Sequence, residues 1–121
     1  MTTPTQAELE ILNILWGMGE LRVQEVHKQL NEVRPIGYTT TLKMMQVMAQ
    51  KGLLARQLDG RSHIYSPVIQ ESTTKNKLLS RFVDSTFGGS RSQLLMQLLG
   101  NAKVSDEELK EIKDFLAQIE E

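Results

Sequence analysis

The sequence contains no cysteine, few aromatic residues and no long hydrophobic run. Without cysteine, the 121-residue chain can form neither disulfides nor thiolate metal sites, which is typical of a reducing compartment. Aromatic residues make up only 5%, so a core must consist mostly of Leu, Ile, Val and Met. No apolar run approaches the ~20 residues that span a bilayer, and the polar residues 1–4 do not resemble a signal peptide. We therefore expect a soluble, cytoplasmic protein without membrane insertion.

Charge is unevenly distributed along the chain, although the net charge is only −1. Residues 34–63 contain five Lys or Arg against one Asp, a net +4, whereas residues 104–121 contain seven acids against two bases, a net −5. Such asymmetry indicates that one part of the protein faces an anion. A pair of solvated faces is the alternative that charge alone leaves open.

Periodicity in the first half of the chain predicts short helices followed by a hairpin. Thr5 and Glu8 have capping-box spacing, and Gly17 and Gly19 are expected to stop the first helix after Trp16. We expect helices over residues 5–16, 23–31 and 38–51, a very short strand at 21–22, a turn at 34–37, and hairpin strands at 54–58 and 62–65. This is the order of a winged helix-turn-helix, in which the third helix would be the recognition helix.

The third helix has two faces. At 100° per residue, Tyr38, Leu42, Met45 and Ala49 cluster on the side expected to face the other helices. Hydroxyl, lysine and apolar side chains suit the major groove, and a helix N-terminus favours a phosphate. The candidate DNA-binding residues on this helix are Thr39, Thr40, Thr41, Lys43, Met44, Val47 and Lys51. A plain surface helix with a threonine cap is the alternative.

The hairpin that follows is expected to be a basic wing. Asp59-Gly60 is a strong two-residue turn signal. The residues expected to pack the wing on the core are Leu54, Leu58, Ile64 and, as a fourth candidate, Tyr65. Arg56 and Arg61, with His63 as a further candidate, would then point outward toward phosphate or the minor groove.

The remainder of the chain is predicted to be helical and to form a dimer. Three short amphipathic segments, separated at Gly88-Gly89 and Gly100 and capped by Ser90 and Ser105, cannot bury their apolar faces alone. A two-fold partner would cover them, and a three-helix core within one chain is the alternative. The candidate dimerisation residues are Leu78, Leu79, Phe82, Leu94, Leu95, Leu98, Leu99, Leu109, Ile112, Phe115, Leu116 and Ile119.

We therefore expect a mainly α protein with a small β-hairpin. A winged helix-turn-helix domain over residues 1–70 would precede a helical dimerisation domain over residues 71–121. An enzyme finds little support, because His27 and His63 have no carboxylate cluster at ligand spacing and the glycines fit no phosphate loop. We expect no catalytic residue, metal or cofactor. A winged-helix module that binds protein rather than DNA remains the main alternative.

Two stretches resemble the penicillinase-repressor and methicillin-resistance-repressor family of bacterial winged-helix transcriptional regulators. "YTTTLKMMQVMAQKGLLARQLDGRSHIYSP" looks like the family's recognition helix and wing, and "TQAELEILNILWGMGELRVQEV" like its opening segment, including Glu8 and Trp16. The resemblance is specific over residues 5–67 and weak in the tail. It implies a dimeric repressor that binds palindromic operators and leaves them when a membrane-sensor protease cuts its tail.

The chain departs from the family pattern in two places. Copper-responsive relatives carry a C-terminal cysteine cluster, and the absence of cysteine excludes that mode of sensing here. Antibiotic-responsive relatives are cut at an Asn-Phe bond, whereas Gln97-Leu98 stands at the corresponding place in this sequence. The resemblance therefore leaves the inducing signal open.

Overall fold

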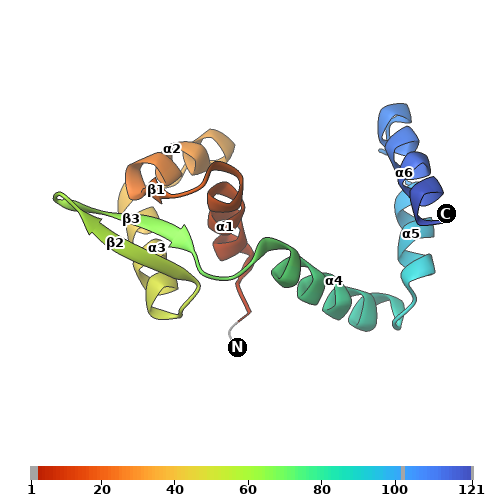
Figure 1. Cartoon of the computed structure of the whole chain (residues 1–121), viewed down its shortest axis with the longest axis horizontal. Coiled ribbons are helices and arrows are strands. Elements are labelled where there is room, and N and C mark those ends of the chain that lie inside the picture. Colours follow the sequence, from red (N-terminus) through yellow and green to blue (C-terminus); the bar gives the residue numbers. More distant parts are fainter. Residues whose placement is uncertain (1–2, 102, 121) are drawn as a thin grey trace. The chain divides into compact units, whose positions relative to one another are not determined.

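The computed structural model describes residues 3–101 and 103–120 (Figure 1). Its helices and strands follow in the order α1 (Gln6–Met18), β1 (Leu21–Arg22), α2 (Val23–Val33), α3 (Tyr38–Gln50), β2 (Leu54–Asp59), β3 (Ser62–Pro67), α4 (Glu71–Phe87), α5 (Arg91–Leu99) and α6 (Asp106–Ile119). The expected mainly helical fold with a small antiparallel sheet is confirmed. The chain divides into two compact units, an N-terminal unit ending at Lys75 and a C-terminal unit starting at Asn76.

Helix α1 begins with the capping box that the sequence predicts. The Thr5 hydroxyl accepts a hydrogen bond from the Glu8 N–H at 3.2 Å, and the Glu8 carboxylate accepts one from the Thr5 N–H at 2.9 Å. The helix continues past Gly17 to Met18, so the expected end after Trp16 is too early. It ends at Gly19, whose φ of 90° is readily adopted only by glycine.

The core of the N-terminal unit is contributed by every element from α1 to β3. Ile11, Leu12 and Leu15 of α1 are buried against residues of α2, α3 and the sheet. The other core residues are Leu21, Val23, Val26, Leu30, Met45, Met48, Leu53, Leu54 and Tyr65. Each such side chain contributes roughly 1.5–3 kcal/mol when it leaves water. This shared core holds α3 and the hairpin in a fixed relation to each other.

The sheet ties the hairpin to the start of α2. Strand order is β1-β3-β2 with both pairings antiparallel, and Leu21 of β1 lies opposite Tyr65 of the central strand. Strand β2 lies on the other side of β3 from β1, and it is the next element after α3 along the chain. The connection is tight because Gly52, at φ 85°, lets the N–H of Leu53 reach the Met48 carbonyl at 3.0 Å.

The start of α4 belongs to the N-terminal unit. Trp16 Nε1 donates to the Ile69 carbonyl at 3.1 Å, and the Lys75 ammonium lies 5.6 Å from the centre of the Trp16 ring. Thr74 is also buried. The division after Lys75 therefore lies five residues later than the expected boundary at residue 70.

In the C-terminal unit the predicted caps are present but most apolar side chains are exposed. Ser90 and Ser105 accept hydrogen bonds from the N–H groups of Gln93 and Glu108. Among the described residues of this unit, Val83 alone is buried. A self-sufficient three-helix core is therefore not formed. None of the described helices combines the length and the hydropathy that a bilayer crossing requires.

Candidate nucleic-acid interface

Helix α3 presents a polar stripe to solvent along its outer face. Thr39, Lys43 and Gln50 are exposed and Gln46 is half-buried, and these four residues follow at intervals of four, three and four positions. Such spacing places them on one side of a helix. We call them the α3 stripe. Thr40 is also exposed, beside the stripe at the helix start.

The helix is rotated by a fraction of a turn from the orientation that the sequence predicts. Thr41 is fully buried, and its hydroxyl lies 3.0 Å from His27 Nδ1 of α2. Tyr38, expected to face inward, is 43% exposed and meets the His27 ring edge-on at 5.5 Å. The prediction that Thr41 contacts DNA is therefore wrong. A hydroxyl with a partner can be buried at low cost, and hydrophobic periodicity does not register it.

Two further predicted DNA-binding residues, Lys51 and Met44, contact other parts of the protein. The Lys51 ammonium pairs with the Glu8 carboxylate at 2.8 Å, so its charge is already compensated within the protein. Met44 is half-buried and packs against the core. Lys51 remains exposed and Met44 half-buried, so the DNA contacts predicted for them stay predictions. Val47 is half-buried without belonging to the core.

Glu8 connects the start of α1 with the end of α3. Its side chain is 7% exposed, and burial by itself raises the pKa of the carboxyl. Hydrogen bonds from Lys51 and from the Thr5 backbone, together with the positive charge of Lys51, outweigh burial and hold the pKa below its usual 4.5. Glu8 is therefore a carboxylate at neutral pH, and it forms an ion pair with the partly exposed ammonium of Lys51.

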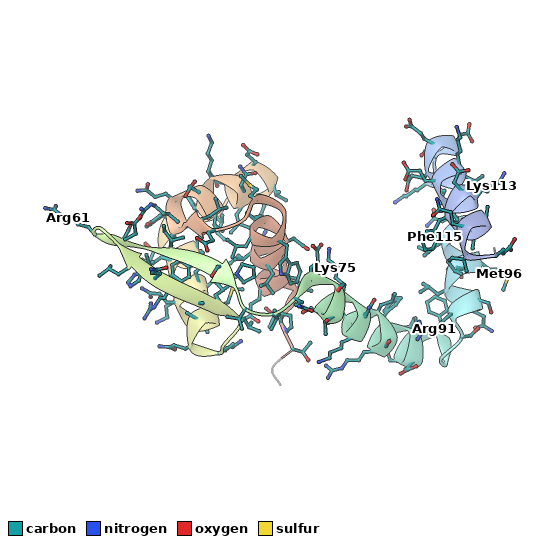
Figure 2. All side chains as sticks on the ribbon, in the orientation of Figure 1. Arg61, Lys75, Arg91, Met96, Lys113 and Phe115 are labelled. Atoms are coloured by element: carbon teal, nitrogen blue, oxygen red, sulfur yellow. The ribbon has the colours of Figure 1, made fainter. Side chains whose placement is uncertain are left out.

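The wing, formed by β2, β3 and their turn, ends in an exposed arginine. Asp59 pairs with Ser62, so the turn residues are Gly60 and Arg61, one position later than the sequence signal suggests. Gly60 has a φ of 68°, whereas none of the described residues other than glycines has a positive φ. Positive φ at the first turn residue alone is the pattern of a type II′ turn, which matches the twist of the strands. Arg61 projects from the tip (Figure 2).

Some side chains of the wing are buried against the core and others are exposed to solvent. Tyr65 and Leu54 are buried as expected, but Leu58 is 64% exposed. It is the last residue but one of β2, and the end of the hairpin extends beyond the helices (Figure 1). The prediction that Leu58 packs on the core is wrong. Arg56 is exposed, and His63 is half-buried with its ring 6.3 Å from that of Tyr65.

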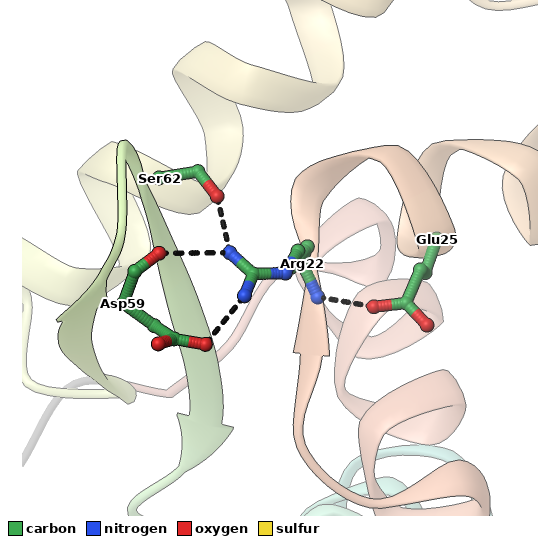
Figure 3. Close-up of polar contacts among 4 residues, drawn as sticks. All are labelled: Arg22, Glu25, Asp59 and Ser62. Carbon is green, nitrogen blue, oxygen red and sulfur yellow. Dashed lines mark hydrogen bonds and ion pairs between the residues drawn. The ribbon is translucent and has the colours of Figure 1, made fainter.

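Arg22 is a functional candidate that sequence patterns did not indicate. Its guanidinium contacts both arms of the wing: Nη1 donates to the Asp59 carbonyl at 3.2 Å and to the Ser62 hydroxyl, and Nη2 pairs with the Asp59 carboxylate at 2.5 Å (Figure 3). The Arg22 N–H meanwhile donates to Glu25 at 2.9 Å. Asp59 and Ser62 are 37 and 40 residues away from Arg22 in sequence, so no local sequence pattern indicates their contact with it.

A cleft of about 250 Å³ separates α3 from the wing. Its walls include Tyr38 and Gln46 of α3, Arg22 at the start of α2, and Arg61 and His63 of the wing. We call this the wing cleft. The wing side carries the Arg61 cation and the Arg22–Asp59 ion pair, and α3 carries hydrogen-bonding groups. Such a cleft suits an extended anionic chain better than a buried small molecule.

The predicted dimerisation residues all lie in the C-terminal unit. Leu78, Leu94, Leu109 and Ile112 are half-buried, and the others are exposed: Leu79, Phe82, Leu95, Leu98, Leu99, Phe115, Leu116 and Ile119. Phe82 and Phe87 contact edge-on at 5.8 Å. Within the described parts of the chain, no cluster of three or more His, Asp or Glu side chains could hold a metal ion.

Three helices packed with a three-stranded sheet, whose hairpin β2–β3 follows α3 and projects from it, define a winged helix-turn-helix protein. A family model described as penicillinase repressor matches residues 4–118. The chain belongs to this family of winged-helix transcriptional repressors and is not an enzyme. Membership implies DNA binding.

Individual relatives are distant but nearly full-length. The chain is 26% identical to the penicillinase repressor of Bacillus licheniformis over 94% of its own length and 89% of the relative. It is 27% identical to the transcriptional regulator BlaI of Mycobacterium tuberculosis, over 93% and 82%. The methicillin resistance regulatory protein MecI of Mammaliicoccus sciuri is 21% identical, over 93% and 91%.

One solved structure matches a little over half of the chain and another matches nearly all of it. The DNA-binding domain of the repressor BlaI matches 57% of this chain and 84% of that domain, with 30% identity and a TM-score of 0.52. A MarR family protein from Bacillus stearothermophilus matches 98% of this chain and 74% of its own, with 19% identity and a TM-score of 0.58. The second likeness concerns the fold alone.

Proposed function

We propose that the protein represses transcription in the bacterial cytoplasm by binding a palindromic operator duplex as a homodimer. Each α3 enters a major groove and each wing lies beside it on the backbone or in the minor groove. The observation that carries the proposal is the wing cleft, since it places a polar helix face and a cationic hairpin on either side of a channel. A DNA strand that leaves the major groove would pass through this channel.

The α3 stripe supplies the base contacts in this proposal. Gln46 and Gln50 can each read adenine through paired hydrogen bonds, and Lys43 can reach the acceptors of guanine. Thr39 and Thr40 stand at the N-terminal end of the helix, where phosphate is favoured. Val47 offers an apolar contact to a thymine methyl group.

The wing supplies contacts that depend on charge rather than sequence. Arg56 and Arg61 are exposed cations on a segment that carries one acid, Asp59, and that acid is paired with Arg22. Phosphate contacts of this kind position a protein on the duplex without reading its sequence. His63, on the wall of the wing cleft, can donate a further hydrogen bond to the backbone.

Exposure of the apolar residues in the C-terminal unit supports the homodimer. Phe115 and Ile119 of α6 are 60% and 62% exposed, and Leu95 and Leu98 of α5 are 51% and 52% exposed. A second copy of the chain would cover both sets. We do not extend the proposal to release by a membrane-sensor protease, because Gln97-Leu98 lies inside α5 and lacks the Asn-Phe pair.

Binding selection on a random duplex library tests the proposal directly. We expect enrichment of a palindrome, and an affinity for the enriched duplex that falls steeply as salt rises. A protein-binding winged helix without DNA specificity would enrich no sequence and would show no such dependence.

A further inference from the structure

Arg22 is placed to control the wing without belonging to it. Its backbone pairs with Ile64 through the sheet, and its N–H is held by Glu25 at the start of α2. The backbone of Arg22 is thereby attached both to the central strand of the sheet and to the start of α2. Its guanidinium reaches the last strand pair of the hairpin, Asp59 and Ser62, beyond which only the two turn residues remain (Figure 3).

This contact has a mechanical consequence. The distal part of β2 is exposed from Ala55 to Asp59, so apolar packing does not hold it. Two-stranded hairpins without a packed face are marginal in water. Arg22 binds a carboxylate and a carbonyl on one arm and a hydroxyl on the other, which fixes the direction in which Arg61 points.

The same contact has an electrostatic consequence. Asp59 lies two positions from Arg61, and an unpaired carboxylate there would repel the phosphates that Arg61 is proposed to bind. Pairing with Arg22 neutralises Asp59 locally, so the wing tip presents a positive charge to DNA. The pair itself is partly exposed, with side-chain exposures of 35% and 59%. It is therefore expected to contribute little to global stability.

We propose that Arg22, although it lines the wing cleft, is a positioning residue for operator binding. Asp59 and Ser62 already bind its guanidinium, so it orients the wing and neutralises Asp59 rather than binding DNA itself. This inference rests on the proposed function. It predicts that the effect of Arg22 on affinity passes through the wing cations, Arg56 and Arg61.

A double-mutant cycle in the full chain tests this prediction, with the duplex that wild-type protein enriches from a random library as the probe. We expect Arg22→Ala to weaken binding roughly ten-fold, equivalent to about 1.4 kcal/mol. In an Arg56→Ala, Arg61→Ala background, the same change should cost less than about two-fold, because coupled residues are not additive. Arg22→Lys should restore only part of the affinity, since an ammonium cannot replace the planar fork.

Matched variants separate positioning from a simple loss of charge. Arg34→Ala breaks another partly exposed pair, with Glu10 at 2.8 Å, and should leave both affinity and wing dynamics unchanged. In Arg22→Ala, hydrogen exchange of the wing amides should accelerate while the melting temperature stays close to that of wild type. Adding Asp59→Asn to Arg22→Ala should recover part of the lost affinity, because it removes the unpaired anion.

The outcomes that overturn the inference differ from those that overturn the proposed function. If Arg22→Ala costs the same with and without the wing cations, Arg22 contacts DNA directly. If Arg22→Ala binds like wild type, the wing needs no such support. A wild-type chain that enriches no duplex overturns the proposed function, and the inference with it.

Discussion

At the scale of single residues, the partly buried pair between Glu8 and Lys51 links stability to pH. A carboxyl with a depressed folded-state pKa contributes stability that is present above its usual pKa, here 4.5, and is lost as pH falls through the folded value. We expect Lys51→Met to cost about 1–2 kcal/mol at neutral pH, because it leaves Glu8 buried with fewer partners. Denaturant unfolding at neutral pH and below 4.5 measures this.

The acid range supplies the check on that assignment. Wild type should lose stability as pH falls below 4.5, and Lys51→Met should lose less over the same interval because the pKa of its Glu8 is no longer held down. Arg34→Met, which breaks an exposed pair, should follow the wild-type pH profile. Parallel profiles for wild type and Lys51→Met would show that Lys51 does not set the Glu8 pKa.

Two neighbouring residues of α3 should behave in opposite ways. Lys43→Ala removes an exposed cation from the α3 stripe, so it should weaken operator binding by about 1–3 kcal/mol and relax preference at one base pair. Thr41→Val removes a buried hydroxyl bound to His27, so it should lower the melting temperature without changing base preference. Binding selection and thermal unfolding of both variants distinguish them. Unchanged specificity in Lys43→Ala would remove this face of α3 from the groove.

Residue-level prediction from sequence is weakest where a polar side chain has a partner within the protein. Thr41 and Lys51 both look like solvent-facing residues by type. Their partners, His27 and Glu8, are 14 and 43 positions away, and only folding brings them together. Lys43, Arg56 and Arg61 were placed correctly on the surface, because long charged side chains without partners stay in water.

At the scale of elements, the wing should carry charge rather than sequence information. Arg61→Ala should weaken binding to all duplexes about equally, and it should reduce the salt slope by ~2 units, since a dimer loses two phosphate contacts. Affinity for specific and unrelated duplexes across a salt series measures both effects. A variant that loses discrimination but keeps its salt slope would show that the wing reads bases.

Elements were predicted better than their ends. The two-residue strand β1, the hairpin and the capped helices follow from local signals: the capping residues Thr5 and Ser105, the apolar spacing, and Gly60. The end of α1 was placed too early because Gly17 alone cannot stop a helix whose buried Leu15 anchors the last turn. The turn register depends on cross-strand pairing, which sequence alone does not determine.

At the scale of the whole molecule, the division after Lys75 defines a fragment that should fold alone. Residues 1–75 include Ile69 and Lys75, which contact Trp16, whereas a fragment that ended at Pro67 would expose this side of α1. We expect residues 1–75 to unfold cooperatively and to sediment as a monomer. A matched fragment ending at Pro67 should be less stable. Equal stability of the two fragments would show that the contacts of Trp16 with Ile69 and Lys75 do not stabilise the fold.

Separating the two units should also remove most of the affinity for the operator. One winged helix makes few phosphate contacts, and a second one tethered to it binds its half-site at high effective concentration, which can add ~10²–10⁴ in affinity without new contacts. The half-sites should then lie ~10 base pairs apart or a multiple of that.

In the full chain, Leu98→Asp places a carboxylate on the exposed apolar face of α5, where it would be buried only in a dimer. This variant should therefore sediment as a monomer, keep the thermal stability of the N-terminal unit and bind the operator as weakly as residues 1–75. Sedimentation with and without the enriched duplex measures all three species, and a 1–75 fragment that binds as tightly as the full chain would show that the C-terminal unit does not serve dimerisation.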